Sequence, residues 1–404
     1  ITLSKKAAPF GLAQVLILHA IARRCIAMSP SELPSEMRYV TARATSAQIA
    51  PADALREALS AVAADLGKQG AAPFDILRLR ISGLEPQAFH LARREMDLAW
   101  REVFGGLRRP VFFGQGSFSV EADAAIAPAR MPTPIWNGMT TSELARAYSP
   151  RLQVPDMQSV FRQWNTDGAI ARQTAGGLDL HYGRGRDEMF DFYPAARRDA
   201  PLWVFLHGGY WQACTKDQHG QFAEGLRAHG FSVVMLDYPL CPETPLREIV
   251  LTLRHALQVL RNEAHALGFD ANRIHLAGHS AGAHLAAFAA ADPHGPDIAS
   301  VLLLSGVFDL DPLFHLPMGR IIGLEDRAEA RTLSPLFSPR PKARVGLALG
   351  ALETDEFKRQ SAEMAQAWGA EAPLHVENCH HFNLLDELRR PGPLLDLALR
   401  TASA

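Results

Sequence analysis

Residues 274–291 read IHLAGHSAGAHLAAFAAA, and this stretch is the strongest indication of the fold class. A short apolar run is followed by small helix-forming residues, so the stretch predicts a strand that passes through a sharp turn into a helix. The turn carries Gly-His-Ser-Ala-Gly at 278–282. A serine in such a turn exposes its hydroxyl, and the flanking glycines leave room for the backbone. Ser280 is therefore a candidate nucleophile, and a simple packing turn is the alternative.

The sequence around this turn alternates between apolar runs and helical segments. From Leu202 onward the strand-like runs are almost continuously apolar, which is typical of parallel strands buried on both faces. These runs are WVFLHG, FSVVMLDY, IHLAG, SVLLLSG, VGLALG and LHVEN. Segments with helical spacing of apolar residues, such as 246–268 and 356–369, lie between them. This order predicts an α/β fold with an open, mostly parallel sheet and helices on both faces.

A second signal is His-Gly-Gly-Tyr-Trp at 207–211, directly after the first of these strands. Acyl transfer needs N–H donors for the developing oxyanion, and a loop of small residues brings backbone amides close to a substrate. The candidate donors are the amides of Gly208, Gly209 and Ala281. The alternative for this loop is a β-turn that ends the strand. Tyr210 and Trp211 add aromatic surface that suits a conjugated substrate, or they cap the end of the sheet.

A serine nucleophile requires a histidine that accepts its proton and a carboxylate that orients the histidine. In this fold class the chain order is serine, acid, histidine. Glu353 follows the strand VGLALG, and His381 follows the strand LHVEN. Both lie at strand ends, where the sites of open parallel sheets assemble. The rival acids are Asp355 and Asp386, and the rival base is His380.

With these residues the chain resembles the serine-dependent kynurenine formamidase (arylformamidase) family of α/β-hydrolases over about residues 141–404. The matching segments are HGGYW at 207–211, DYPLCPE at 237–243, GHSAGAHLAA at 278–287, LSGVFDL at 304–310, LETDEFKRQS at 352–361 and HHFNLLDEL at 380–388. The resemblance implies that Ser280 is the nucleophile, Glu353 the acid and His381 the base, with no metal and no organic cofactor. Many relatives carry aspartate where Glu353 stands, which keeps Asp355 open as the acid.

The earlier part of the chain predicts a different, smaller α+β domain in the order β-α-β-α-β-β, with helices over residues 52–66 and 86–104. It resembles the reactive-intermediate deaminase (RidA) family, small trimeric proteins that hydrolyse enamines and imines at subunit interfaces. The nearest matches to the arginine and glutamate of that family are Arg108 or Arg109 and Glu121. The resemblance implies either a second active site or a degenerate domain that forms oligomers.

We therefore expect a RidA-like domain over residues 1–130, a proline-rich linker and lead-in over 131–160, and an α/β-hydrolase domain over 161–404. The apolar stretch 11–22 superficially resembles a signal peptide, but Arg23 and Arg24 follow it where small cleavage-site residues would stand. It is also only about half of the ~20 residues that a membrane span requires.

The composition of the 404 residues limits the partners. Lys and Arg total 41 against 43 Asp and Glu, a formal net charge of -2, which argues against a nucleic-acid binder. The four cysteines lie far apart in the sequence, which disfavours a disulfide framework and a structural zinc site. We expect a cytoplasmic homo-oligomer that acts on a small molecule, without membrane or nucleic-acid partners, and that assembles through its first domain.

These observations predict a serine hydrolase that cleaves a small amide or ester through an acyl-enzyme, with a formamidase-like reaction favoured. A carboxylesterase of the same fold would use the same intermediates. A third hypothesis joins the amide hydrolase to an enamine or imine deaminase in the catabolism of a nitrogen-bearing ring-cleavage product. A fourth, a binding module on a hydrolase scaffold, is disfavoured because all three members of the triad are present.

Overall fold

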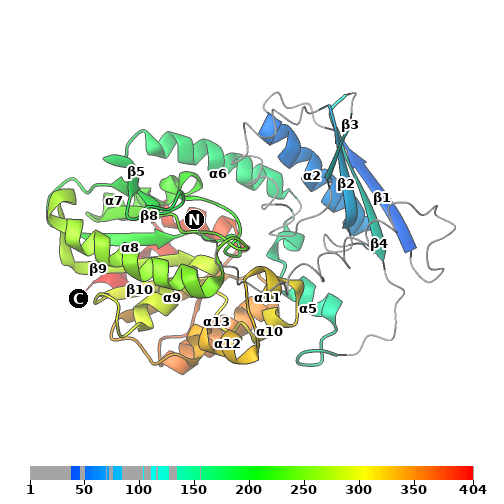
Figure 1. Ribbon diagram of the computed structural model, residues 1–404. Coiled ribbons are helices and arrows are strands. Elements are labelled where there is room, and N and C mark those ends of the chain that lie inside the picture. Colours follow the sequence, from blue (N-terminus) through cyan, green and yellow to red (C-terminus); the bar gives the residue numbers. More distant parts are fainter. Residues whose placement is uncertain are drawn as a thin grey trace, which may run out of the picture. The chain divides into compact units, whose positions relative to one another are not determined.

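The computed structural model describes residues 38–45, 51–69, 71, 76–83, 103, 111–114, 117–126, 134–154 and 156–403. These residues form two compact units, which hold the elements between Arg38 and Ile126 and those from Pro134 to Ser403 (Figure 1). Each unit has its own sheet. The stretch 11–22 and the helix expected over 86–104 lie outside the described residues, apart from Val103, which is helical.

The first unit contains one helix, α2 (Pro51–Lys68), and a four-stranded sheet within the described residues. The strands are β1 (Arg38–Ala44), β2 (Ile76–Ser82), β3 (Val111–Gly114) and β4 (Ser119–Ile126). Their order is β1-β4-β2-β3, in which β4 runs antiparallel to both β1 and β2. Leu55, Leu59 and Val62 of α2 are fully buried, so the apolar stripe expected over 52–66 forms the core of this unit.

The second unit is built on an eight-stranded sheet. Its strands are β5 (Gly177–His181), β6 (Met189–Tyr193), β7 (Ala200–Leu206), β8 (Ser232–Leu236), β9 (Phe269–His279), β10 (Ser300–Leu304), β11 (Arg344–Gly350) and β12 (Leu374–Val376). The order is β12-β11-β10-β9-β7-β8-β6-β5, and the strands from β7 to β12 are parallel. Each of the six predicted strand-like runs overlaps one of these parallel strands, which confirms the mostly parallel sheet.

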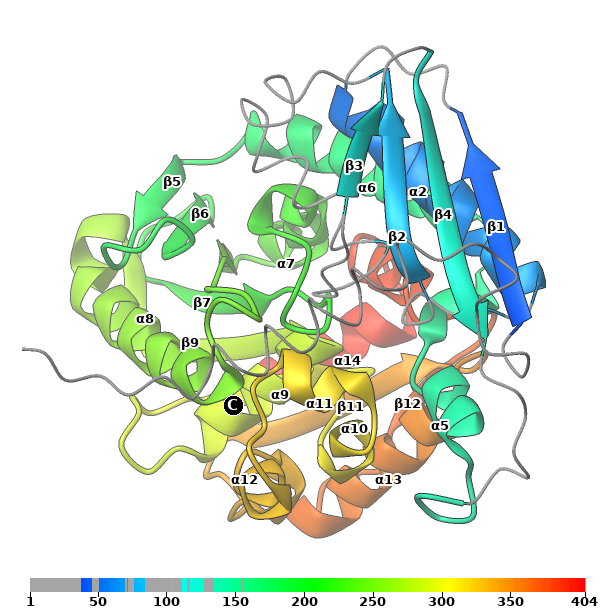
Figure 2. The same cartoon turned by 45° about the vertical axis from the view of Figure 1, so that its right-hand side comes forward.

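Helices cover both faces of this sheet (Figures 1 and 2). They are α5 (Thr141–Ala147), α6 (Met157–Arg172), α7 (Glu224–Ala228), α8 (Leu246–Leu267), α9 (Ala281–Ala291), α10 (Asp311–Phe314), α11 (Pro317–Ile321), α12 (Arg327–Thr332), α13 (Asp355–Trp368) and α14 (Pro393–Ala402). Short 3-10 turns are η3 (Pro150–Gln153), η4 (Lys216–Gln218), η5 (Gly220–Ala223), η6 (Pro335–Phe337) and η7 (Asn383–Leu388). None of the helices in the described part of the chain is both long and apolar enough to cross a bilayer.

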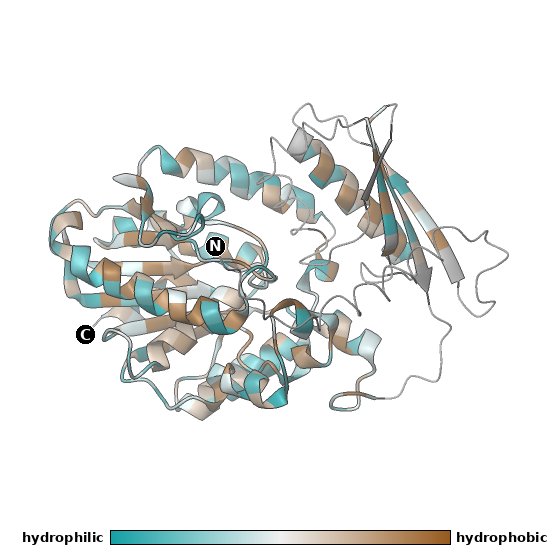
Figure 3. Ribbon diagram, viewed as in Figure 1, coloured by the Kyte–Doolittle hydropathy of each residue, from teal (hydrophilic) through white to brown (hydrophobic). Residues whose placement is uncertain are grey.

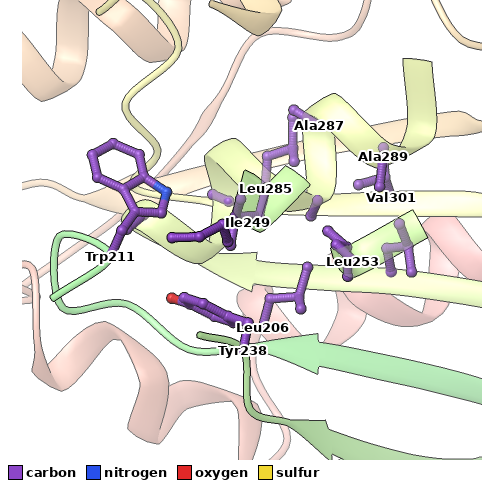
Figure 4. Packing of buried hydrophobic residues seen from close by; sticks show 14 of the residues in the cluster. Leu206, Trp211, Tyr238, Ile249, Leu253, Leu285, Ala287, Ala289 and Val301 are labelled. Carbon is purple, nitrogen blue, oxygen red and sulfur yellow. The ribbon is translucent and has the colours of Figure 1, made fainter. Parts of the chain in front are cut away.

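Alternate residues of β7 enter different hydrophobic cores, because successive side chains of a strand point to opposite faces of a sheet. Leu202, Val204 and Leu206 lie in a cluster with residues of α8, α9 and α13. Trp203 and Phe205 lie in a second cluster with residues of α6, α7 and α14. Figure 3 shows hydrophobic and hydrophilic bands alternating along α8, and Figure 4 shows the packing between α8, α9 and the sheet. The near-continuous apolar strands therefore follow from burial on both faces.

The segment predicted as linker and lead-in packs against the second unit over its described residues. Helix α5 begins with a capping box, in which Thr140 and Glu143 bond to each other's backbone N–H groups. Leu144 and Tyr148 are buried in the cluster that holds α8 and α9. The segment therefore contributes to the core of the second unit.

Gly282 tests how closely the turn after β9 packs against β7. A Cβ on Gly282 would lie 2.0 Å from the Leu206 carbonyl oxygen, which is backbone and cannot easily move. We expect Gly282→Ala to lower the free energy of unfolding by about 3 kcal/mol, measured by urea unfolding followed by tryptophan fluorescence. Gly295→Ala is the matched control, since its new Cβ would meet only ordinary contacts at 3.5 Å or more. Equal stability of the two variants would contradict this packing.

Candidate active site

The serine turn joins β9 to α9 with an unusual backbone conformation. Ser280 has φ 56° and ψ −118°, a combination that residues with side chains seldom adopt. Its backbone N–H donates to the carbonyl of Leu304 at the end of β10. Gly278 has no space for a side chain, because a Cβ there would lie 2.1 Å from the Gly282 carbonyl oxygen. The two glycines of the motif thus allow the strand and the helix to meet at Ser280, as the sequence predicts.

The loop 207–211 lies directly against this turn. A Cβ on Gly208 would be 3.0 Å from Nδ1 of His279 and 3.2 Å from Cβ of Ser280. Gly209 has φ 98°, which favours glycine, and a Cβ there would lie 2.2 Å from the Ala213 carbonyl oxygen. Ala281 is the first residue of α9, so its N–H has no acceptor within the helix. The structure therefore places Gly208 and Ala281, two of the predicted amide donors, at the serine turn, and Gly209 follows Gly208 in the loop.

Glu353 and His381 come together at the carboxyl edge of the sheet. Nδ1 of His381 and Oε2 of Glu353 are 2.7 Å apart, and both side chains are buried. Oε1 of Glu353 accepts hydrogen bonds from the Ser305 hydroxyl and from the Gly350 N–H. Because the carboxylate offers hydrogen-bond acceptors, this bond places the hydrogen on Nδ1 and leaves Nε2 as the ring nitrogen that can accept a proton.

The rival residues lie elsewhere in these loops. Asp355 is exposed and begins α13. Nδ1 of His380 accepts hydrogen bonds from the N–H groups of Phe382 and Asn383, so it fixes the local turn. Asp386 lies in η7, where burial raises the pKa of its carboxyl above the usual value. The carboxylate that holds His381 is therefore Glu353.

His279, between the glycine and the serine of the motif, links the serine turn to the loop of His381. Its Nε2 lies 2.7 Å from the backbone oxygen of His381, and the two rings are 4.6 Å apart. Burial lowers the pKa of His279 well below its usual value, so the ring is neutral and Nε2–H donates to the carbonyl. No local sequence pattern predicts this contact, because it joins residues 102 positions apart.

The two aromatic residues of the loop are held differently. The hydroxyl of half-buried Tyr210 donates to the Tyr148 carbonyl at 2.6 Å, and burial raises its pKa above the usual range. Trp211 is fully buried, with its ring edge-on to His284 at 4.9 Å between centroids (Figure 4). The capping role considered for Trp211 fits this burial.

The second site expected in the first unit is only partly visible. Arg108 and Arg109 lie outside the described residues. Glu121 lies on β4, in register with Arg43 of β1 and with Arg80 of β2.

Within the described residues, three carboxylates lie close enough to hold a metal ion: Asp179, Asp191 and Asp217. The ammonium of Lys216 lies 2.6 to 2.9 Å from an oxygen of each, and the guanidinium of Arg172 pairs with all three. Because both cations already pair with each of the three carboxylates, the cluster is a structural ion-pair network.

Comparison with known proteins adds independent findings. Residues 203–318 match the family model for the alpha/beta hydrolase fold. Kynurenine formamidase of Danio rerio is 29% identical over 280 residues, which cover 63% of this chain and 93% of that protein. Carboxylesterase NlhH of Mycobacterium tuberculosis is 36% identical over 117 residues, 27% of this chain and 36% of that protein. The crystal structure of a candidate thioesterase from a Silicibacter species aligns with TM-score 0.57 and 29% identity over 63% of this chain and 97% of that one.

The bond from His279 to His381 generates a testable expectation. His279→Phe keeps a ring but leaves the His381 carbonyl unpaired, which costs about 1–3 kcal/mol of folding free energy. His284→Phe is the matched control, since it removes a similar 2.7 Å bond from a buried histidine to the Leu333 carbonyl. We expect both variants to unfold at lower urea concentration but only His279→Phe to lose hydrolytic turnover, by about tenfold. Equal turnover in the two variants would show that His279 acts on stability alone.

Proposed function

We propose that the chain hydrolyses a small aryl formamide through an acyl-enzyme on Ser280. The proposal starts from the finding that the chain is a kynurenine formamidase-like α/β-hydrolase acting on amide or ester bonds. The observation that carries the proposal is the buried 2.7 Å bond between His381 and Glu353, in loops that meet the serine turn. A histidine oriented in this way by a carboxylate is the base that a serine nucleophile requires.

In the proposed mechanism Oγ of Ser280 attacks the formyl carbon, while Nε2 of His381 takes the hydroxyl proton. The carbonyl oxygen becomes an oxyanion, which the amides of Gly208, Gly209 and Ala281 stabilise. His381 then returns the proton to the departing nitrogen as the C–N bond breaks, and Glu353 stabilises the imidazolium throughout. A water molecule next attacks the formyl ester, His381 takes its proton, and formate leaves as the Ser280 hydroxyl is restored.

The burial of the site supports a small acyl group. Ser280 and His381 are each 2% exposed and Glu353 is 3% exposed. A formyl group adds only a hydrogen to the carbonyl carbon, so it needs less space beside the serine than any other acyl group. The similarity to kynurenine formamidases over 93% of the Danio rerio protein supports an N-formylkynurenine-type substrate.

Ester hydrolysis is the second candidate, favoured by the likeness to a carboxylesterase over 117 residues. Amides and esters pass through the same intermediates, so only a comparison of substrates can distinguish a formamidase from an esterase. The experiment is to compare kcat/KM for N-formylkynurenine with that for p-nitrophenyl acetate and butyrate. A clear preference for the formamide supports the proposal, and a preference for the butyrate ester would replace it with a carboxylesterase.

Several other properties inferred from the sequence stay predictions. These are the boundaries of the three segments, assembly of a homo-oligomer through the first unit, an enamine or imine deaminase activity there, and a cytoplasmic location.

Replacement of the proposed nucleophile is the most direct test. Ser280→Ala removes the attacking oxygen, and we expect kcat to fall by about 10⁵-fold or more. Labelling by a fluorophosphonate probe should also disappear, while circular dichroism stays unchanged. Ser300→Ala is the control, because Ser300 is also buried but begins β10 at the opposite edge of the sheet. A Ser280→Ala variant that keeps its activity would refute the mechanism.

The identity of the acid can be tested in the same assay. Glu353→Gln keeps the shape of the side chain but cannot stabilise the imidazolium, so we expect kcat to fall by about 10³- to 10⁴-fold. Asp355→Asn should leave kcat within about twofold of the parent, because the exposed Asp355 carboxylate is well screened by solvent. The reverse pattern would make Asp355 the acid.

A further inference from the structure

The carboxyl end of α5 lies between two loops of the proposed active site. The Ala147 carbonyl accepts a hydrogen bond from the Thr354 hydroxyl at 2.7 Å. The next carbonyl, of Tyr148, accepts one from the Tyr210 hydroxyl at 2.6 Å. Thr354 directly follows the proposed acid, and Tyr210 directly follows a proposed oxyanion donor. Two successive carbonyls of the lead-in segment thus bind one loop each.

These carbonyls are well suited to this role. The last carbonyls of a helix have no partner within the helix, and the helix dipole makes that end a good acceptor. Helix α5 ends at Ala147, and Tyr148 is its C-cap residue. Both hydroxyl groups therefore satisfy acceptors that the helix leaves open.

The end of α5 is itself anchored by the Tyr148 side chain. Its hydroxyl donates to Glu356 at 2.8 Å and accepts from Gln360 at 2.6 Å, both on α13. Gln360 also accepts the backbone N–H of Asp309, in the loop after β10. The carbonyls are therefore fixed relative to the helix that follows the proposed acid.

Thr354 uses its hydroxyl in an unusual way. It occupies the N-cap position of α13, where a threonine normally accepts a hydrogen bond from its own helix. No such capping bond forms here, and the hydroxyl donates to Ala147 instead. The local sequence alone would predict the cap.

The backbone of the loop 207–211 must be held in place by contacts with other parts of the structure. Tyr210 has φ 52° and Trp211 has φ 56°, both in the left-handed region that favours glycine. Such conformations persist only when the surrounding structure holds them. The hydrogen bond from the Tyr210 hydroxyl to the Tyr148 carbonyl restrains the backbone next to Gly209.

We propose that the carbonyls of Ala147 and Tyr148, with the hydroxyls of Thr354 and Tyr210, form a clasp. This clasp fixes the loop 207–211, here called the oxyanion loop, against the loop that carries Glu353. Thr354 and Tyr210 are positioning residues, because they act through the backbone of the loops that carry the proposed donors and acid. The proposal rests on the proposed function and makes residues 141–148 a component of the active site.

Removal of the Tyr210 hydroxyl tests the clasp. Tyr210→Phe keeps the ring, and we expect kcat to fall by about 10- to 100-fold with KM within about threefold, because the donors lose their alignment in the transition state. Tyr182→Phe is the matched control, since it removes a 2.9 Å bond from a buried tyrosine to the Asp237 carbonyl. The control should keep its kcat. An equal loss of kcat in both variants would show that the Tyr210 hydrogen bond contributes only to overall stability, and it would overturn the proposal.

Thr354 provides a second test that does not depend on the folding of the first variant. Thr354→Val keeps the shape but removes the donor, and Thr354→Ser keeps the donor. We expect kcat to fall about tenfold in the valine variant and to recover in the serine variant. The double variant Tyr210→Phe with Thr354→Val should lose less than the product of the single losses, since both break the same clasp. Equal activity of the valine and serine variants would overturn the proposal.

Labelling separates failure of the clasp from failure of the proposed function. If fluorophosphonate labels Ser280 in the parent protein and the Tyr210 and Thr354 variants keep the parental kcat, the clasp alone is wrong. If the parent protein is not labelled at Ser280 and shows no turnover of formamide or ester, the proposed function is wrong and the clasp falls with it.

Discussion

The sheet edge that carries the proposed active site depends on close packing of backbone against backbone around the serine turn. Gly282 lies against the carbonyls at the end of β7, and Gly278 lies against the carbonyl of Gly282. Neither position has space for a methyl group, so the helix α9 can begin directly over the strand that precedes the oxyanion loop. Because the interior is packed without voids, this one constraint fixes where Ser280 lies relative to that loop.

Hydrogen bonds then hold loops that are distant in the sequence in position relative to the serine turn. His279 binds the backbone of His381, and Glu353 binds the ring of His381. Both interactions are buried, where unpaired polar groups are costly, so each loop has one favourable position. The proposed clasp at the end of α5 adds two further hydrogen bonds between the lead-in segment and these loops. The lead-in segment thereby becomes part of the framework around the proposed site.

The burial of the proposed triad has consequences for its chemistry. Water is largely excluded at Ser280 and His381, which strengthens electrostatic interactions with a developing oxyanion.

The sequence predicted the parallel sheet and the candidate triad, because both depend on local patterns: apolar runs, glycines beside a serine, and polar residues that follow strands. It left Glu353 and Asp355 as rivals, since two carboxylates two positions apart look alike until one is buried against His381. Only the tertiary structure revealed the roles of His279, Thr354 and Tyr148. Their partners are 102, 207 and 62 positions away, and hydrogen bonds over such separations depend on how the loops pack together rather than on neighbouring residues.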